Sequence, residues 1–266
     1  MKRTLSGLAL VATLCLLLAA CSSRQTKEKF PEPPAGGNTE AQAHKLYGSA
    51  HDQLVRRNYV QANKEFDTLM SHYPFSRYAT QAQLEQIYAK YQSNDPEEAL
   101  SDANRFLQEH PRYPSADYVL YLEGLINMRR SESLTRYLHV NQTYFDPSHL
   151  EAAFDDFALL QRRFPDSRYA ADARQRMIWL RNRIAQHELN TARFYFGRGA
   201  WVAAARRAQG IIANYPGAPA TASALVIMQQ SYAALGLKEQ ATQIQALIAE
   251  NRPALKAAGV TPQSRE

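Results

Sequence analysis

The side chains best suited to acid–base or metal chemistry are seven histidines and a few neighbouring carboxylates. None of the histidines lies in an H-E-x-x-H motif or a comparable metal-ligand spacing. His187 and Glu188 are adjacent, so on a helix they point apart, and Asp155 with Asp156 is expected to be a solvated pair. There is no G-x-S-x-G motif and no phosphate-binding loop. The sequence therefore predicts a non-enzymatic protein with no catalytic residue, no metal site and no cofactor.

Cys21 is the residue with a clear chemical fate, because it directly follows Leu-Ala-Ala at residues 18–20. Lys2 and Arg3 and an apolar run over residues 8–18 precede it, in the order of a bacterial secretory signal. The apolar run is shorter than the ~18–20 residues that a membrane-spanning helix needs. The stretch resembles the lipobox of bacterial lipoproteins, which implies cleavage before Cys21 and lipidation of that cysteine.

The residues around the cysteine also predict a location. Ser22 follows Cys21, and an aspartate there would favour the inner membrane, so the resemblance implies the outer membrane. A lipidated cysteine of this kind carries several acyl chains, which hold a protein in a membrane more firmly than one chain does. We therefore expect a lipid-anchored protein of a Gram-negative bacterium that faces the periplasm. Cys15 leaves with the signal, so the mature chain has no free thiol. Thiol redox chemistry and thiolate metal sites are thereby excluded.

Positive charge is concentrated in one segment. Residues 161–210 hold eleven arginines and no lysine, against three acidic residues, whereas the whole chain has a net charge of +6. Such a patch favours docking to an acidic partner or to lipid headgroups. A solvated arginine face on a long helix is the alternative. A secreted lipoprotein rarely meets nucleic acid, so we predict no nucleic-acid partner.

A repeated motif organises most of the chain, since Tyr73–Ala79 returns as Phe164–Ala170. Further prolines at positions 111, 216 and 253 close weaker copies. Between successive closing prolines, at positions 74, 111, 165, 216 and 253, the steps are 37, 54, 51 and 37 residues. Between the prolines, small and apolar residues recur at three and four positions, and no alternating run indicates a strand. The sequence predicts an all-α fold, a TPR-like α-solenoid of five helix-pair repeats.

Each unit resembles the tetratricopeptide (TPR) motif, which has small residues where paired helices approach and proline at its thirty-second position. Residues of the expected kind lie at small and large apolar positions of all five units, namely Ala50, Ala62, Phe66, Leu69, Ala99, Phe106, Ala153, Phe157, Leu160, Ala192, Ala204, Ala208, Ile211, Ala241 and Ile248. Ile87 departs from the motif, which has a small residue there. Asp95-Pro96 and Asp146-Pro147 are expected to start helices, with the aspartate as the N-cap.

Two long steps locate two special segments. A surplus of 17 residues falls at about 131–146, after a helix expected to end near Arg130, and predicts a long loop or an extra short helix. A surplus of 14 residues falls within Ala171–Phe196, which has neither proline nor glycine. It corresponds to about four helical turns, so we expect an elongated helix that joins two halves. The predicted organisation is a lipoprotein signal peptide (1–20), a lipidated flexible tether (21–40), an N-terminal TPR half with repeats 1–3 (41–165), a C-terminal TPR half with the long helix and repeats 4–5 (166–258), and a flexible tail (259–266).

TPR modules use fixed positions of each first helix as a concave wall, and five tyrosines occupy such positions in the first three repeats. The residues expected in this substrate-peptide groove are Tyr47, His51, Tyr88, Tyr91, Tyr118, Tyr121 and Arg129. Tyrosine offers a large contact area with a polar tip, which suits an extended or helical peptide with aromatic side chains. Arg129 could bind the terminal carboxylate of such a peptide. About half of the tyrosines are expected to pack between repeats instead.

The lipobox, the tether, the five repeats and the segment Phe194–Ala203 together resemble the BamD (ComL) family, lipoproteins of the β-barrel assembly machinery. The resemblance covers essentially the whole mature chain. It implies docking on a POTRA domain of BamA, association with other Bam lipoproteins and binding of unfolded outer-membrane β-barrel proteins. It also implies BamA contacts for Arg207 and Arg198, although Arg207 could be an ordinary exposed arginine. Trp201 is expected to pack in the core.

Two other functions share parts of this pattern. A periplasmic TPR scaffold lipoprotein for peptidoglycan or cell-division enzymes would have the same fold, tether and groove, with a peptidoglycan enzyme in place of BamA. A cell-wall hydrolase with an accessory TPR array would need a separate catalytic domain, and every residue after 40 is already assigned to the repeats. The assembly role is the function that the sequence favours.

Overall fold

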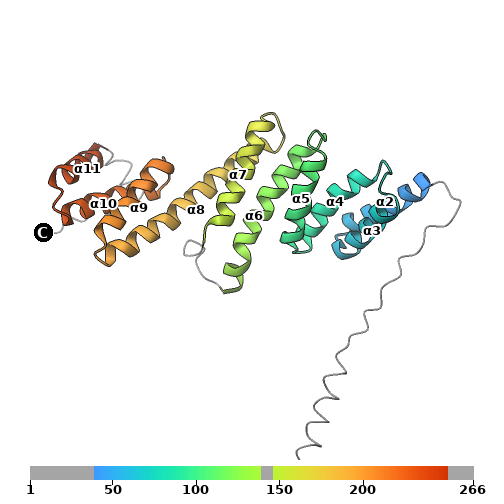
Figure 1. The fold of residues 1–266 in the computed structure, drawn as a ribbon, viewed down its shortest axis with the longest axis horizontal. Coiled ribbons are helices and arrows are strands. Elements are labelled where there is room, and N and C mark those ends of the chain that lie inside the picture. Colours follow the sequence, from blue (N-terminus) through green and yellow to red (C-terminus); the bar gives the residue numbers. More distant parts are fainter. Residues whose placement is uncertain (1–38, 139–145, 251–266) are drawn as a thin grey trace, which may run out of the picture. The chain divides into compact units, whose positions relative to one another are not determined.

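The computed structural model describes residues 39–138 and 146–250, so Cys21, the signal peptide and most of the predicted tether and tail lie outside the described residues. Within these two ranges the chain forms ten α-helices and no strand, which confirms the all-α class (Figure 1). In chain order the helices are α2 (Thr39–Val55), α3 (Tyr59–His72), α4 (Ala79–Gln92), α5 (Pro96–Glu109), α6 (Ala116–Leu138), α7 (Ser148–Arg163), α8 (Ala170–Gly197), α9 (Trp201–Asn214), α10 (Ala220–Ala234) and α11 (Lys238–Glu250).

The helices pack in the order of the sequence. Each makes its main contacts with the helix before it and the helix after it, as the row of hairpins in Figure 1 shows. The five pairs α2–α3, α4–α5, α6–α7, α8–α9 and α10–α11 are the five helix-pair repeats, which confirms the TPR-like solenoid. The first helices of the early repeats also touch, α2 against α4 and α4 against α6. Equivalent faces of successive repeats therefore lie side by side.

The core follows the row of helices as four apolar clusters in succession. Every residue expected at a TPR packing position is buried, and most have no exposed surface at all. Ile87, the departure from the motif, is also fully buried, so α4 places a large side chain where other repeats place a small one. Because each cluster is shared by three or four consecutive helices, each repeat depends on its neighbours for burial of its apolar face.

Helix α8 is the elongated helix that the sequence predicts, with 28 residues from Ala170 to Gly197. Its first half contributes Ala173 and Leu180 to the cluster shared with α6 and α7. Its second half contributes Leu189 and Ala192 to the cluster shared with α9, α10 and α11. One uninterrupted helix therefore takes part in two successive cores.

The end of α6 differs from the expectation. The helix does not end near Arg130 but continues to Leu138. The reason is local, because residues 131–138 contain neither proline nor glycine and nothing there terminates a helix. The first part of the predicted insertion is thus a helical extension, and residues 139–145 lie outside the described residues.

Of the two aspartates expected as N-caps, Asp95 holds that position, whereas Asp146 precedes the N-cap of α7, which is Pro147. Asp95 is the N-cap of α5, where its carboxylate accepts a hydrogen bond from the Glu98 N–H at 3.4 Å and Pro96 is the first helical residue. At α7 the helix begins at Ser148, one residue later than expected. Asp146 still accepts hydrogen bonds from the Ser148 N–H at 3.1 Å and from its hydroxyl at 3.0 Å, which lowers the pKa of Asp146.

Candidate functional site

An open hollow of about 760 Å³ lies over the first helices of repeats 1 to 3 and the loop between α7 and α8. Tyrosine and leucine side chains make up its apolar walls, and charged groups lie among them. The lining residues are His51, Leu54, Gln81, Leu84, Glu85, Tyr88, Pro114, Ser115, Asp117, Tyr118, Arg168 and Tyr169. Of the predicted groove residues, His51, Tyr88 and Tyr118 line this hollow.

The regular repeat length explains why these side chains meet. His51 and Tyr88 are 37 residues apart, as are Gln81 and Tyr118, which is one full repeat. Since α2, α4 and α6 touch in order, residues at equivalent positions point from the same face of adjacent helices. The constant repeat length and the contacts between the first helices therefore place these four side chains on one wall.

One end of the hollow is a hydrogen-bonded cluster around Glu85, which is only 8% exposed. Its carboxylate accepts hydrogen bonds from the Tyr47 hydroxyl at 2.5 Å and from Gln81 Nε2 at 3.0 Å, and it lies 2.8 Å from His51 Nδ1. Burial and the Glu85 carboxylate together raise the pKa of Tyr47 well above its usual value. Tyr47 thus holds Glu85 in place, while the His51 ring stays about half exposed, at 46%.

The other end of the hollow is formed by two residues that sequence reasoning did not select. The guanidinium of Arg168 lies 4.8 Å from the centroid of the Tyr169 ring and donates a hydrogen bond to its hydroxyl. Tyr169 in turn stacks on Tyr121 at 4.8 Å and contacts Tyr118 at 5.4 Å. The loop before α8 therefore closes the aromatic wall that begins on α6.

The repeated motif carried the signal that would have found this pair. Arg77 and Tyr78, in the first copy of the motif, make the same arrangement, with the guanidinium 4.9 Å from the ring centroid. Tyr78 also stacks on a tyrosine of the preceding first helix, Tyr47, at 5.4 Å. An identical Ser-Arg-Tyr-Ala segment thus builds the same arginine–tyrosine unit at two places in the chain.

Besides Tyr47, three predicted groove residues, Tyr91, Tyr121 and Arg129, are engaged between helices and do not line the hollow. The guanidinium of Arg129 lies 3.9 Å from the centroid of the Tyr91 ring and donates a hydrogen bond to the Tyr91 carbonyl. The Tyr121 hydroxyl donates a hydrogen bond to Asp172 Oδ2 at 2.5 Å. The structure thus places the Arg129 guanidinium against Tyr91 of α4.

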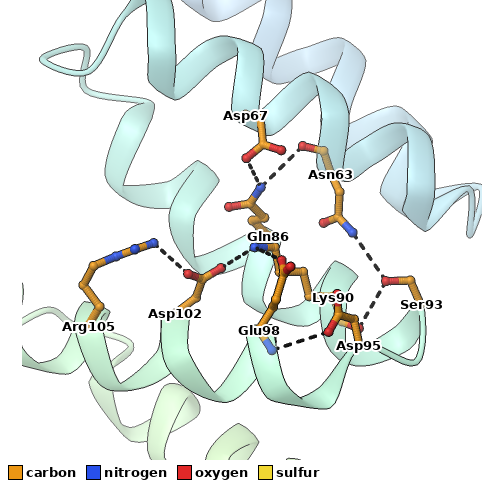
Figure 2. Close-up of polar contacts among 9 residues, drawn as sticks. All are labelled: Asn63, Asp67, Gln86, Lys90, Ser93, Asp95, Glu98, Asp102 and Arg105. Atoms are coloured by element: carbon orange, nitrogen blue, oxygen red, sulfur yellow. Dashed lines mark hydrogen bonds and ion pairs between the residues drawn. The ribbon is translucent and has the colours of Figure 1, made fainter. Parts of the chain in front are cut away.

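The face of α4 opposite the hollow is held by a polar seam (Figure 2). Gln86, which is 3% exposed, donates a hydrogen bond to Asp67 Oδ1 of α3 at 2.6 Å. Asn63 of α3 donates to the Ser93 hydroxyl at the end of α4, at 3.4 Å. These contacts join repeat 1 to repeat 2 and thereby fix the rotation of α4, which presents Tyr88 to the hollow.

Lys90 completes the seam toward α5. Its ammonium group lies 2.8 Å from Asp102 Oδ2 and 2.9 Å from Glu98 Oε2, and Arg105 lies 2.7 Å from the other oxygen of Asp102 (Figure 2). Burial by itself would lower the pKa of Lys90, but hydrogen bonds to the two carboxylates outweigh it and raise the pKa. Lys90 is therefore charged and ion-paired at neutral pH.

The predicted docking residues of the second half lie on the surface. Arg207 of α9 donates a hydrogen bond to Glu188 Oε2 of α8 at 2.9 Å, with 48% of its side chain exposed. Arg198 is exposed, and its guanidinium lies 4.2 Å from the centroid of the Phe194 ring. Trp201 was expected in the core. It is instead half-buried at the surface against Phe196, with ring centroids 5.0 Å apart.

Residues 39–138 and 146–250 contain neither a metal-binding cluster nor a candidate membrane span. No group of three or more histidine, cysteine, aspartate or glutamate side chains in these ranges could hold a metal ion. None of the helices in these ranges combines the length and the hydropathy that a membrane crossing requires.

Comparisons with known proteins agree over almost the whole chain. Residues 39–247 match the model of the YfiO family, which is described as an outer membrane lipoprotein family. The chain is 36% identical to the outer membrane protein assembly factor BamD of Neisseria meningitidis serogroup A, over 92% of this chain and 90% of that protein. It is similar to the proteins of the same name from Vibrio cholerae, at 36% identity over 89% of this chain and 93% of that protein, and Pasteurella multocida, at 34% over 94% and 92%.

Proposed function

This chain belongs to the BamD (YfiO) family of outer membrane lipoproteins, and we propose that it is the subunit of the β-barrel assembly machinery that docks on BamA and binds unfolded outer-membrane proteins. In this proposal the chain catalyses no reaction. Lipidation at Cys21 anchors it to the outer membrane, and residues 39–250 face the periplasm. The observation that carries the proposal is the match to assembly factors over about nine-tenths of both chains.

The hollow is the proposed binding site for unfolded substrate. Tyr88, Tyr118 and Tyr169 offer ring faces and edges, and Leu54 and Leu84 lie among them. Such a surface favours aromatic and aliphatic side chains of an extended peptide. Because Glu85 is already hydrogen-bonded within the protein, its burial leaves no unpaired charge that would oppose binding of an apolar side chain.

The second half is the proposed docking site for the POTRA domain of BamA. Arg198 and Arg207 are exposed there and belong to the arginine-rich segment 161–210. The exposed guanidinium of Arg198 next to the exposed Phe194 ring provides the mixture of charge and apolar area common at protein interfaces. Other Bam lipoproteins are further proposed partners.

The test is purification of the native lipoprotein from detergent-solubilised outer membranes, followed by identification of the partner present in equal amount. A BamA-type barrel is the expected partner. Recovery of peptidoglycan or cell-division enzymes without the barrel would overturn the proposal in favour of a TPR scaffold. A variant with Cys21→Ala provides the control for anchoring, because it should remain in the inner membrane or the soluble fraction.

A further inference from the structure

We propose that the peptide track does not end at the hollow but continues along the first half of α8, where Trp179 and Arg183 form a second subsite. The subsite would take an aromatic side chain next to a carboxylate of the same extended peptide. This inference rests on the proposed function, because the peptide must already occupy the hollow.

Contacts between α6 and α8 make the surface continuous. Tyr121 and Met128 lie three and ten residues after Tyr118, which is the spacing of one helix face. Asp172 of α8 accepts the Tyr121 hydroxyl hydrogen bond at 2.5 Å. Arg176 lies 5.9 Å from the centroid of the Tyr121 ring, and its Nη1 lies 3.9 Å from Met128 Sδ. The side of α6 that carries Tyr121 and Met128 therefore contacts the side of α8 that carries Asp172 and Arg176.

The same side of α8 then presents an exposed aromatic residue. Asp172, Arg176, Trp179 and Arg183 are spaced by four, three and four residues, which places them on one helix face. Trp179 is 38% exposed and its neighbour Ile178 is 42% exposed, although α8 packs on α7, α9 and α10. These two adjacent side chains give α8 an accessible apolar surface beside the cation of Arg183.

The distribution of charge indicates which ligand group would bind here. The guanidinium of Arg183 lies 5.4 Å from the centroid of the Trp179 ring, so an aromatic platform and a cation stand together. Along this side of α8 the cations Arg176 and Arg183 outnumber the single carboxylate of Asp172. Arginine pairs favourably with carboxylates, and tryptophan gives the largest ring face for stacking.

The opposite end of the track carries the opposite charge. In the lining of the hollow, Glu85 and Asp117 outnumber the single arginine, Arg168, whereas arginines outnumber the carboxylate along this side of α8. A peptide with a free carboxyl terminus would therefore bind in one direction, with that terminus toward Arg183. An aromatic residue at or near the terminus would stack on Trp179.

The chain offers its own reporter for a test, because it has two tryptophans, Trp179 and Trp201. In the full mature lipidated chain with Trp201→Phe, Trp179 is the sole source of tryptophan fluorescence. The probe is a synthetic extended peptide of alternating polar and apolar residues that ends in phenylalanine with a free carboxylate. Its affinity is measured by calorimetry, and the emission of Trp179 is followed in a parallel titration.

We expect the emission of Trp179 to change with the same dissociation constant that calorimetry gives. Trp179→Ala should weaken binding about tenfold, whereas Phe194→Ala should not, since that exposed ring lies about 22 Å further along α8. Amidation of the peptide terminus removes the carboxylate and should weaken binding to the parent chain. It should cause no further loss of affinity in Arg183→Gln, which lacks the cation that pairs with the carboxylate. Peptide binding with an unchanged Trp179 signal and full affinity in Trp179→Ala would overturn this subsite and leave the hollow intact. Absence of any binding would overturn the proposed substrate site itself.

Discussion

Gly124 of α6 lies directly against the ring of Phe157 on α7, so that a Cβ at position 124 would lie 2.4 Å from Phe157 Cε1. Real Cβ atoms essentially never approach another atom so closely, so Phe157, which is fully buried, would have to shift. The glycine therefore sets how close α6 and α7 can pack. It lies between Tyr121 and Met128, on the helix that carries the aromatic wall toward α8.

Gly124→Ala is expected to destabilise the fold by about 1–3 kcal/mol, because a methyl group there overpacks a core contact. Thermal unfolding followed by far-UV circular dichroism measures the effect. Gly48→Ala in α2 is the matched control, since no heavy atom lies within 4 Å of its Cβ position. Alanine is the better helix former, so the control should be unchanged or slightly more stable. Equal melting temperatures for the two variants would contradict the close contact.

A buried carboxyl group, Glu123, and a half-buried one, Asp156, at the α6–α7 contact predict a pH dependence of stability. Glu123 is 4% exposed, and burial together with the charge of Asp156 raises its pKa to about 8. Burial also raises the pKa of Asp156, to about 6, although Asn127 Nδ2 donates a hydrogen bond to it at 2.7 Å. Both values exceed those of an unfolded chain, so the folded state holds protons that the unfolded state has released.

The unfolding free energy should therefore fall as the pH rises from about 5 to about 8. Glu123→Gln keeps a neutral group of the same shape and should remove most of this slope. Glu151→Gln, an exposed position of α7, should retain it. Denaturant unfolding at several pH values is the measurement, and parallel slopes in the parent chain and Glu123→Gln would refute the assignment.

Removal of Lys90 should loosen the seam that orients α4. Lys90→Met leaves Asp102, whose side chain is 12% exposed, with Arg105 as its remaining ion-pair partner. We expect the free energy of unfolding to fall by about 1–3 kcal/mol. This is less than the full cost of leaving a buried charge unpaired, because Arg105 still pairs with Asp102. Arg105→Met removes a cation that is 57% exposed and should cost less than about 1 kcal/mol. Denaturant unfolding compares the two, and an equal loss would argue against a special role for Lys90.

Two tyrosines of one helix separate binding from packing. Tyr88→Ala should weaken the affinity for an unfolded-protein peptide about tenfold, because that ring lines the hollow. Tyr91→Ala, three residues further along α4, should leave the affinity unchanged, since that ring packs under Arg129. Calorimetry with a synthetic peptide gives both values, and circular dichroism checks that each variant is folded. The reverse order of effects would exclude the hollow as the substrate site.

Charge reversal at Arg207 tests the docking surface. Arg207→Glu should weaken capture of a BamA-type barrel by at least about tenfold while leaving helicity intact, since exposed ion pairs contribute about 0–1 kcal/mol to stability. The exchanged pair Glu188→Arg with Arg207→Glu restores the internal ion pair. If the arginine acts on the partner, the exchanged pair should still fail to capture the barrel. Full capture by Arg207→Glu would remove this residue from the interface.

The sequence by itself determined the helical repeats and the wall made by His51, Tyr88 and Tyr118. Helix periodicity and TPR packing are local properties, and a constant step of 37 residues brings equivalent positions onto one face. The same reasoning located the long helix α8, because its segment contains no residue that ends a helix.

Tertiary structure alone decided which polar groups remain available. Tyr47 and Glu85 are 38 residues apart, as are Tyr91 and Arg129, and Tyr121 is 51 residues from Asp172. Whether such side chains face a ligand or each other depends on the rotation and spacing of neighbouring helices. Those are set by side-chain volumes at the helix contacts and by polar partners distant in the chain, which no local pattern encodes. That is why Arg129 turns to Tyr91 while Arg168 reaches the hollow.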